Sequence, residues 1–179
     1  ISHSHPEIHH NLFYHDTASW GGAIEVQDTC APQIVNNTIA HNHASMKGGG
    51  IDVWTSSKID VRNTILWENT AAESGSQVHL TEENDTINLY YSDIQFGKPG
   101  IGGPGKKLDW VESITDDPLF EGSDTSFYFL TENSPCIDTG DPTISDPDGT
   151  RCDMGAFFFP LIGGDREFLL IREHGLQCY

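Results

Sequence analysis

The strongest constraint on the fold is a short phrase that recurs at a fixed interval. It reads GGAIEV, then GGGIDV, then SQVHL, and its apolar anchors Ile24, Ile51 and Val78 are each 27 residues apart. A constant period of this length is typical of a solenoid, in which one coil of chain stacks on the next. The repeat therefore predicts stacked coils with these three side chains in the core.

A second phrase repeats out of phase with the first. It reads HNLF, NNTI and RNTI, and its asparagines Asn11, Asn37 and Asn63 are 26 residues apart. Apolar and polar residues alternate over short runs within each coil, which is the pattern of β-strands, and three strands with their turns fit such a coil. Because parallel coils stack like residues on like, we expect the asparagines to form an inward ladder of side-chain amides.

These patterns predict an all-β fold, a right-handed single-stranded parallel β-helix with coils of about 26–27 residues. About three and a half coils are expected over residues 1–96. Residues 97–179 are expected to add a loop at 97–107 and an irregular C-terminal cap within the same domain. Aromatic residues of this half are expected to close the open end of the apolar column, namely Phe120, Phe127, Tyr128, Phe129 and the phenylalanines at 157–159.

The charge excludes two classes of partner. Lysine and arginine number 9 against 27 aspartates and glutamates, which gives a net charge of -18. So acidic a surface repels the phosphates of nucleic acids and anionic membranes. No apolar run reaches the roughly 20 residues that a membrane span needs. The charge suits a soluble extracellular protein, a cation-binding surface or a neutral ligand.

The four cysteines contain no CxxC pair, which disfavours a zinc site. Cys136 and Cys152 flank one loop. They either close it as a disulfide, in agreement with a secreted protein, or remain thiols. Cys30 and Cys178 are expected to be single thiols, or a second pair if the tail folds back.

The chain opens in the middle of the repeat, because Ile1 precedes Pro6 much as Val26 precedes Pro32. The first residues therefore look like the tail of an earlier coil. An uncovered solenoid end exposes strand edges and apolar core. Two explanations stay open: the chain is a fragment of a longer protein, or another β-helix chain stacks on the N-terminal coil.

The phrases NNTI, ILWENTA, GSQV, YSDI and DPLF, followed by SPCIDTGDP and DPDGTRCDMGAF, resemble the C-terminal part of secreted bacterial right-handed parallel β-helix proteins. The run 134–158 is similar to the closing segment of choice-of-anchor Q proteins, and the GGAI phrase is similar to repeats of polymorphic outer-membrane adhesins. The resemblance covers roughly residues 6–160 and implies a secreted or cell-surface location. Such proteins include adhesins, surface-anchored proteins of unknown role and relatives of polysaccharide lyases.

One candidate catalytic site lies on the repeated strand itself. The middle residues of the three phrases, Glu25, Asp52 and His79, are expected to point away from the core and to align on one face. Adjacent coils would hold the two carboxylates about 5 Å apart, close to the separation in retaining glycosidases. Trp20 and Trp54 lie near this face and are candidates for stacking on sugar rings. The alternative is a solvated polar wall without catalysis, and the scarcity of nearby basic residues disfavours a lyase.

A candidate calcium site comes from Asp146 and Asp148, with Asp141 before them and Asp153 after. The run Asp-x-Asp-Gly resembles the opening of a calcium loop, in which oxygens at alternating positions face one ion. The loop is not an EF-hand, since Phe157 stands where a bidentate glutamate is required. The alternative is an Asx-type turn, in which aspartate side chains bond nearby backbone.

The sequence thus favours a secreted or cell-surface β-helix scaffold for adhesion, carbohydrate contact or extracellular assembly, without catalysis. The first alternative is a polysaccharide lyase or glycoside hydrolase that uses Glu25, Asp52 and His79. The second alternative is a subunit of an extracellular filament that docks through its N-terminal coil. The expected partner is a polysaccharide or cell-surface glycan, and calcium is the one cofactor that the sequence suggests.

Overall fold

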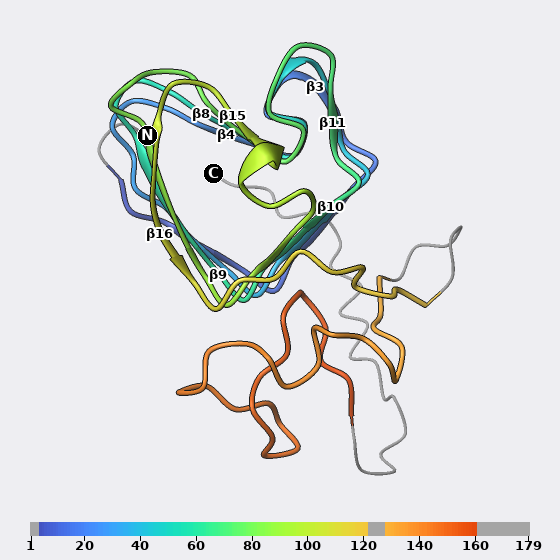
Figure 1. Ribbon diagram of the computed structural model, residues 1–179. Helices are drawn as coiled ribbons and strands as arrows, with labels where there is room; N and C mark the ends of the chain where they lie inside the picture. The colour runs from blue at the N-terminus through green and yellow to red at the C-terminus, as the bar shows by residue number, and fades with distance from the viewer. Residues whose placement is uncertain (1–3, 122–127, 161–179) are drawn as a thin grey trace, which may run out of the picture.

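The chain folds as a parallel β-solenoid of about 4 turns with almost no helix. The computed structural model describes residues 4–121 and 128–160. Seen along the solenoid axis, successive coils lie one behind another over most of their path (Figure 1). The predicted all-β stack of parallel coils is confirmed.

Each coil contributes strands to four parallel sheets, which we name A to D. Sheet A has the order β1 (Glu7–His9), β5 (Gln33–Val35), β9 (Lys58–Arg62), β13 (Thr86–Tyr90) and β16 (Lys106–Val111). Sheet B has the order β14 (Asp93–Ile94), β10 (Ile65–Trp67), β6 (Thr38–Ala40) and β2 (Leu12–Tyr14). Sheet C has the order β11 (Thr70–Ala71), β7 (His43–Lys47) and β3 (Thr17–Trp20). Sheet D has the order β15 (Ile101–Gly102), β12 (Val78–Leu80), β8 (Ile51–Val53) and β4 (Ile24–Val26).

Sheet C was not predicted, because three strands were expected in each coil. Its segments read TASW, HASMK and TA, and their small and polar residues resemble a turn. Ala44 is nevertheless fully buried at the middle of this sheet. The strands of sheet C are therefore stabilised by pairing with the neighbouring coils rather than by an apolar pattern of their own.

The core is the predicted apolar column. Ile24, Ile51 and Val78 occupy matching positions in β4, β8 and β12, and Ile101 of β15 is next in register. The exposed fraction is 8% at Ile24, 0% at Ile51 and Val78, and 2% at Ile101. Burying one such side chain contributes about 1.5–3 kcal/mol, so the column stabilises each coil against its neighbours.

The glycine turn that precedes each strand of sheet D lies directly against that strand. Gly48 and Gly75 have φ angles of 67° and 69°, in the left-handed region that glycine adopts without strain. A Cβ on Gly48 would lie 2.8 Å from the Cβ of Asp52, and one on Gly75 would lie 2.7 Å from the Cβ of His79. The turn therefore covers the outward side chain of the strand that follows it, and only glycine leaves the necessary room.

The predicted asparagine ladder forms for two of its three members. Asn37 Oδ1 accepts hydrogen bonds from the backbone N–H and the side-chain amide of Asn11, at 3.0 and 3.1 Å. The next position belongs to Thr64, whose Oγ1 accepts from the Asn37 N–H at 3.2 Å across a spacing of 27 residues. The prediction is wrong for Asn63, since this longer coil moves it out of the ladder. Its side chain instead faces Cys152, 3.3 Å away in the C-terminal part of the chain.

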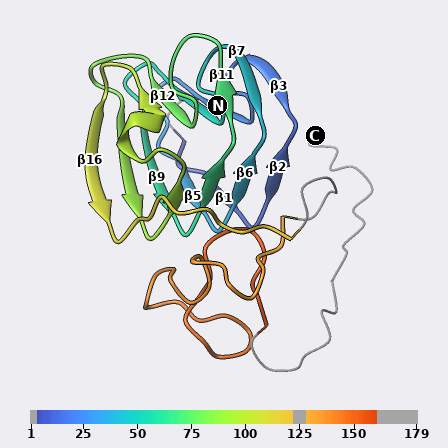
Figure 2. The same cartoon turned by 45° about the vertical axis from the view of Figure 1, so that its right-hand side comes forward.

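The C-terminal segment, residues 112–160 as far as they are described, does not close the end of the solenoid as predicted. It lies beside the stack in Figure 1 and Figure 2. A second core forms on the outward face of sheet B, where Ile65 is 0% exposed and packs in one cluster with Leu130 and Met154. Side packing follows because β10 is apolar on both faces: Leu66 belongs to the column and Ile65 to this second core.

The aromatic residues expected at the open end take part in this side packing. Phe120 packs against the second core, and its ring centroid lies 5.0 Å from that of Tyr128. The rings of Phe129 and Phe157 are 4.8 Å apart. Phe127 lies outside the described residues. For the described part of this segment the prediction of an end cap is therefore wrong: Phe120 packs on the flank of the solenoid, and the rings of Phe129 and Phe157 pack on each other.

The stretch predicted as a loop at 97–107 contains regular structure. Lys98–Gly100 form a short 3-10 helix, η1, and Ile101–Gly102 form the last strand of sheet D. The loop prediction is wrong at this point, because Ile101 extends the apolar column, and the solenoid strands continue to Val111. No helix in the described part of the chain is long and apolar enough to cross a membrane.

Candidate functional site

The predicted catalytic face is in register, but only its first member faces solvent. Glu25, Asp52 and His79 are neighbours across β4, β8 and β12. Glu25 is exposed, whereas the exposed fraction is 1% for Asp52 and 3% for His79. The glycine turns described above cover these two side chains. The expectation of an outward, solvated row is therefore wrong for Asp52 and His79.

Asp52 and His79 form a buried pair between adjacent coils. Asp52 Oδ1 lies 3.1 Å from His79 Nδ1, and the Thr81 hydroxyl lies 3.3 Å from the same oxygen and 3.0 Å from the same nitrogen. A residue that exchanges a proton with a substrate must come within hydrogen-bonding reach of it. Because Asp52 and His79 are buried, a substrate cannot come within hydrogen-bonding distance of them. The pair is therefore better explained as a contact that stabilises adjacent coils than as a general acid and base.

The two tryptophans predicted to stack on sugar rings are both partly buried. Lys47 Nζ lies 5.4 Å from the centroid of the Trp20 ring, a distance at which an ammonium group is attracted to the ring face. The Trp54 indole N–H is buried and has no hydrogen-bond partner among the residues that the structure describes. Ligand binding by these two rings stays a prediction.

Two aspartates of the predicted calcium loop form Asx-type turns. Asp141 Oδ1 accepts from the N–H and the hydroxyl of Thr143 at 2.9 and 2.7 Å. Asp148 Oδ1 accepts from the same two groups of Thr150 at 3.1 and 2.7 Å. This is the alternative that the sequence left open, and it accounts for both side chains without an ion.

The other two aspartates of that loop are also held by backbone groups. Asp146 Oδ2 accepts from the N–H of Asp153 at 2.8 Å, and Asp153 Oδ1 accepts from the N–H of Asp138 at 2.8 Å. Burial raises the pKa of Asp153 to about 7, and the charges of Asp146 and Asp138 add to this rise. Across residues 4–121 and 128–160, no three His, Cys, Asp or Glu side chains are arranged to hold a metal ion. Calcium binding stays a prediction from the sequence.

The predicted disulfide between Cys136 and Cys152 is not formed. The Cys136 thiol donates to Asp93 Oδ2 at 3.3 Å, whereas Cys152 Sγ lies 3.3 Å from Asn63 Nδ2. Both residues are thiols, and each sulfur faces a different polar partner; this is the second of the two alternatives that the sequence left open. Burial, together with the Asp93 charge, raises the pKa of the Cys136 thiol far above its ordinary value.

A polar hollow that was not predicted lies on the outward face of sheet A. It has a volume of about 130 Å³ and is lined by Gln33, Val35, Asp60, Arg62 and Tyr90. These residues alternate along β5, β9 and β13 with buried side chains of the column, so the strand period turns all five outward. Enclosed small-molecule sites have volumes of about 300–1,000 Å³. The hollow is therefore suited to part of a ligand that lies across the surface.

Arg62 is held from two sides of this hollow. Its guanidinium carbon lies 4.9 Å from the ring centroid of Tyr90, and the guanidinium donates to Asp141 Oδ2 of the C-terminal segment. Burial alone would raise the pKa of Asp141, but hydrogen bonds from Thr143 and the Arg62 guanidinium outweigh it and the net shift is downward. Asp141 is thus a carboxylate that balances the Arg62 charge at the edge of the hollow.

The remaining polar groups of the hollow are tied across coils. Asn88 Nδ2 donates to Asp60 Oδ1 at 2.7 Å, and Lys58 Nζ lies 3.3 Å from the same oxygen. The Tyr90 hydroxyl donates to Asp109 Oδ2 at 2.9 Å, and partial burial with this hydrogen bond raises the pKa of Tyr90. These contacts fix the side chains before any ligand arrives, which reduces the entropy lost on binding.

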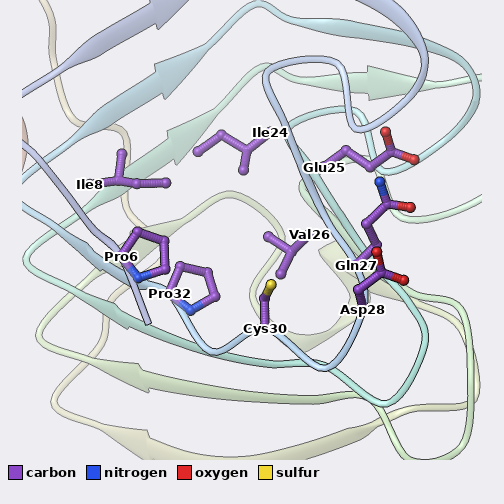
Figure 3. A pocket seen from close by; sticks show the side chains of 9 residues that line it. All are labelled: Pro6, Ile8, Ile24, Glu25, Val26, Gln27, Asp28, Cys30 and Pro32. Atoms are coloured by element: carbon purple, nitrogen blue, oxygen red, sulfur yellow. The ribbon is translucent and has the colours of Figure 1, made fainter. Parts of the chain in front are cut away.

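A second hollow, of about 210 Å³, lies inside the first coil (Figure 3). The side chains of Ile8 and Ile24 point into it, as does Cys30, whereas the Glu25 carboxylate points away. The side chains that point into it are apolar or a thiol, and Ile8 and Ile24 pack in the column, so the hollow is the first layer of the column; Glu25, Gln27 and Asp28 stand at its rim. The suggested partner of Cys30, Cys178, lies outside the described residues.

One sequence signal pointed to the sheet A hollow. KIDVR and TINLY each alternate between column and surface, and their outward set includes Asp60, Arg62, Asn88 and Tyr90. An acid, a cation, an amide and an aromatic ring on one face are a combination typical of ligand binding. The repeat spacing concealed their alignment, because Asp60 and Asn88 are 28 residues apart rather than 26 or 27.

Strand pairing and surface together define this chain as a parallel β-solenoid with a polar hollow on sheet A. Comparisons of the chain with protein-family models, curated proteins and solved structures found no match. The fold class therefore depends on the strand pairing, and a function has to be inferred from the surface itself.

Proposed function

We propose that the protein is a secreted or cell-surface scaffold that binds a glycan through the outward face of sheet A, without catalysis. The observation that carries the proposal is the hollow that contains Gln33, Asp60, Arg62 and Tyr90. An amide, a carboxylate, a guanidinium and an aromatic ring meet there on the outside of a sheet. The extracellular setting is what the resemblance to secreted β-helix proteins implies.

These groups match the two kinds of surface on a sugar ring. The C–H face of the sugar packs on the part of the Tyr90 ring that the Arg62 guanidinium leaves uncovered. The hydroxyls donate to a carboxylate such as Asp60 and accept from the amide of Gln33 or the guanidinium of Arg62. A tyrosine also provides a large contact area with little side-chain entropy to lose. The hollow is small because it needs to hold only part of a longer chain.

Catalysis is not part of the proposal, because in the predicted carboxylate pair Glu25 faces solvent but Asp52 does not. Asp52 is buried against His79. Asp60 Oδ1 accepts from Asn88, with Lys58 also beside it. An acid–base pair for glycoside cleavage needs two carboxyl groups that flank a bond of the substrate. Burial of Asp52 leaves Glu25 without its predicted partner, which favours binding without bond cleavage.

The test is binding of the wild-type protein and of Tyr90→Ala to a panel of soluble polysaccharides, by affinity electrophoresis and calorimetry, with and without calcium. We expect at least one polysaccharide to bind, and Tyr90→Ala to weaken this binding by more than about tenfold, as truncation of a central aromatic contact does. Tyr14→Ala is the matched control, since Tyr14 is 42% exposed on β2 of sheet B and should not contribute.

Three results would contradict the proposal. Equal losses for Tyr90→Ala and Tyr14→Ala, or a full affinity in both, would remove sheet A as the binding face. Reducing ends or unsaturated products that appear in the same mixtures would show that the protein cleaves its ligand.

A further inference from the structure

We propose that the ligand of sheet A is a neutral, hydroxyl-rich glycan whose chain runs parallel to the solenoid axis, across β5, β9 and β13. This inference rests on the function proposed above and adds the charge class of the glycan and its direction. Three features of the face carry it: the rows that the coils build, the pairing of the cations, and the border formed by the C-terminal segment.

The first row of side chains runs from coil to coil across sheet A. Gln33, Asp60 and Asn88 are partners in register in β5, β9 and β13. Glu7 stands beside Gln33 in β1, and the Asp109 N–H donates to Asn88 Oδ1 at 3.2 Å. Because paired strands lie about 4.8 Å apart, the four members in register, Glu7, Gln33, Asp60 and Asn88, span roughly 14 Å along the axis. Asn88 is only 5% exposed and holds Asp60 by a hydrogen bond, so Glu7, Gln33 and Asp60 are the members of the row that can meet an extended chain of sugar rings.

A second row lies beside the first. Val35, Arg62 and Tyr90 are also in register in β5, β9 and β13. They follow the first row by two residues on each strand and therefore share its face. An extended glycan presents hydroxyls along its edges and C–H faces between them. The polar row matches such an edge, and the row of Val35, Arg62 and Tyr90 matches the ring faces.

The cations at the hollow are already paired with carboxylates. Lys58 Nζ lies 3.3 Å from Asp60 Oδ1, and Arg62 donates to Asp141. Lys106 stands in register with the start of β13, in the row of Lys58 and outside the lining of the hollow. A uronate or sulfate would have to displace a carboxylate and approach a chain of net charge -18. The hydroxyls of a neutral glycan, in contrast, donate charge-assisted hydrogen bonds to the same carboxylates.

The C-terminal segment borders one end of the strands and leaves the axial direction open. Arg62 is the last residue of β9, and the chain turns at Asn63, which has a φ angle of 47°. Asn63 Oδ1 accepts from the N–H of Asp141 at 2.8 Å, so the segment lies directly beyond the strand. A ligand that ran along the strands would soon meet this segment. Along the axis, the two rows continue from coil to coil.

The test compares neutral and uronic-acid oligosaccharides of matched length, from disaccharide to hexasaccharide, by calorimetry at low and high salt. We expect only the neutral series to bind, with an affinity that rises with length until the rows are filled and that changes little with salt. Asp60→Asn should lower the neutral affinity by about tenfold, because it removes the charge from a hydrogen-bond acceptor. Glu83→Gln, in the exposed turn before β13, is the matched control that removes one negative charge elsewhere. Thermal melts by circular dichroism show that each variant is folded.

The outcomes separate this inference from the proposed function. Salt-sensitive binding of the uronic series would overturn the charge class and leave glycan binding intact. Neutral binding that Glu7→Ala and Gln33→Ala both leave unchanged would overturn the axial direction, since the exposed part of the polar row would then be unused. Failure of both series to bind would remove the inference together with the proposed function.

Discussion

Replacing Asp93 by asparagine should make the stability of this protein less dependent on pH. Asp93 lies in β14 beneath the C-terminal segment and is 0% exposed. The Cys136 thiol donates to its Oδ2 at 3.3 Å, whereas Oδ1 is buried without a hydrogen-bond partner among the described residues. Burial, reinforced by the charges of Asp116 and Asp117, raises the pKa of Asp93 from 3.8 to about 7.

The shift sets both the size and the sign of the effect. About three pKa units correspond to about 4 kcal/mol. Because the folded pKa of Asp93 is raised, the folded protein holds the proton more tightly, and the stabilisation is complete below pH 3.8 and lost as the pH rises to about 7. Asparagine cannot ionise. The difference in unfolding free energy between the wild type and Asp93→Asn should therefore change by about 4 kcal/mol from about pH 4 to about pH 8, in favour of the variant at high pH.

Urea denaturation of both proteins at acid, intermediate and alkaline pH measures this difference, and carbon NMR of the Asp93 carboxyl follows its titration directly. Asp153, whose pKa is also about 7, is present in both proteins and cancels. Glu83→Gln controls for the change in net charge. Parallel stability curves for the wild type and Asp93→Asn, or a carboxyl that titrates at its ordinary value, would refute the reasoning.

Two further predictions concern packing and are measured by urea denaturation. Gly75→Ala should lower the unfolding free energy by more than about 2 kcal/mol, because its Cβ would lie 2.3 Å from the Val78 carbonyl oxygen at a φ of 69°. Gly149→Ala, with a φ of 88° and nothing within 4 Å of the added Cβ, is the control for backbone strain alone and should cost about 1 kcal/mol; equal losses would contradict the contact argument. His79→Ala should cost about 3 kcal/mol by leaving Asp52 buried without its imidazole partner. The double variant Asp52→Ala/His79→Ala should lose less unfolding free energy than the sum of the losses in Asp52→Ala and His79→Ala. Additive losses would show that Asp52 and His79 are not coupled.

The apolar column was predictable because its members obey one rule. Ile24, Ile51 and Val78 stack at a constant interval, and a parallel coil can bury an apolar residue only against its equivalent in the next coil. The same rule placed Asn11 against Asn37. It failed at Asn63, where one additional residue in the coil changed the partner to Thr64.

The exposure of outward residues was not predictable from the repeat. Glu25, Asp52 and His79 are equivalent in sequence, yet Asp52 and His79 are buried and Glu25 is exposed. Asp52 has paired strands on both sides, and the turn at Gly48 lies against its Cβ. Among the described residues, Glu25 lies in the outermost strand of sheet D, whose one paired neighbour is β8. Burial at these positions depends on neighbours that are distant in sequence.

By itself, the sequence determined the period, the parallel stack and the column, since stacked coils must present like residues to one another and the pattern of a strand is local. Only the tertiary structure decided which polar residues meet. The hollow of Asp60, Arg62 and Tyr90 depends on spacings that differ by one residue from coil to coil, and its edge comes from Asp141, 79 residues after Arg62. The C-terminal segment lies beside the stack because it buries Ile65, an apolar side chain on the outward face of sheet B. Contacts of this kind depend on how separate faces pack together, and no periodicity in the chain records them.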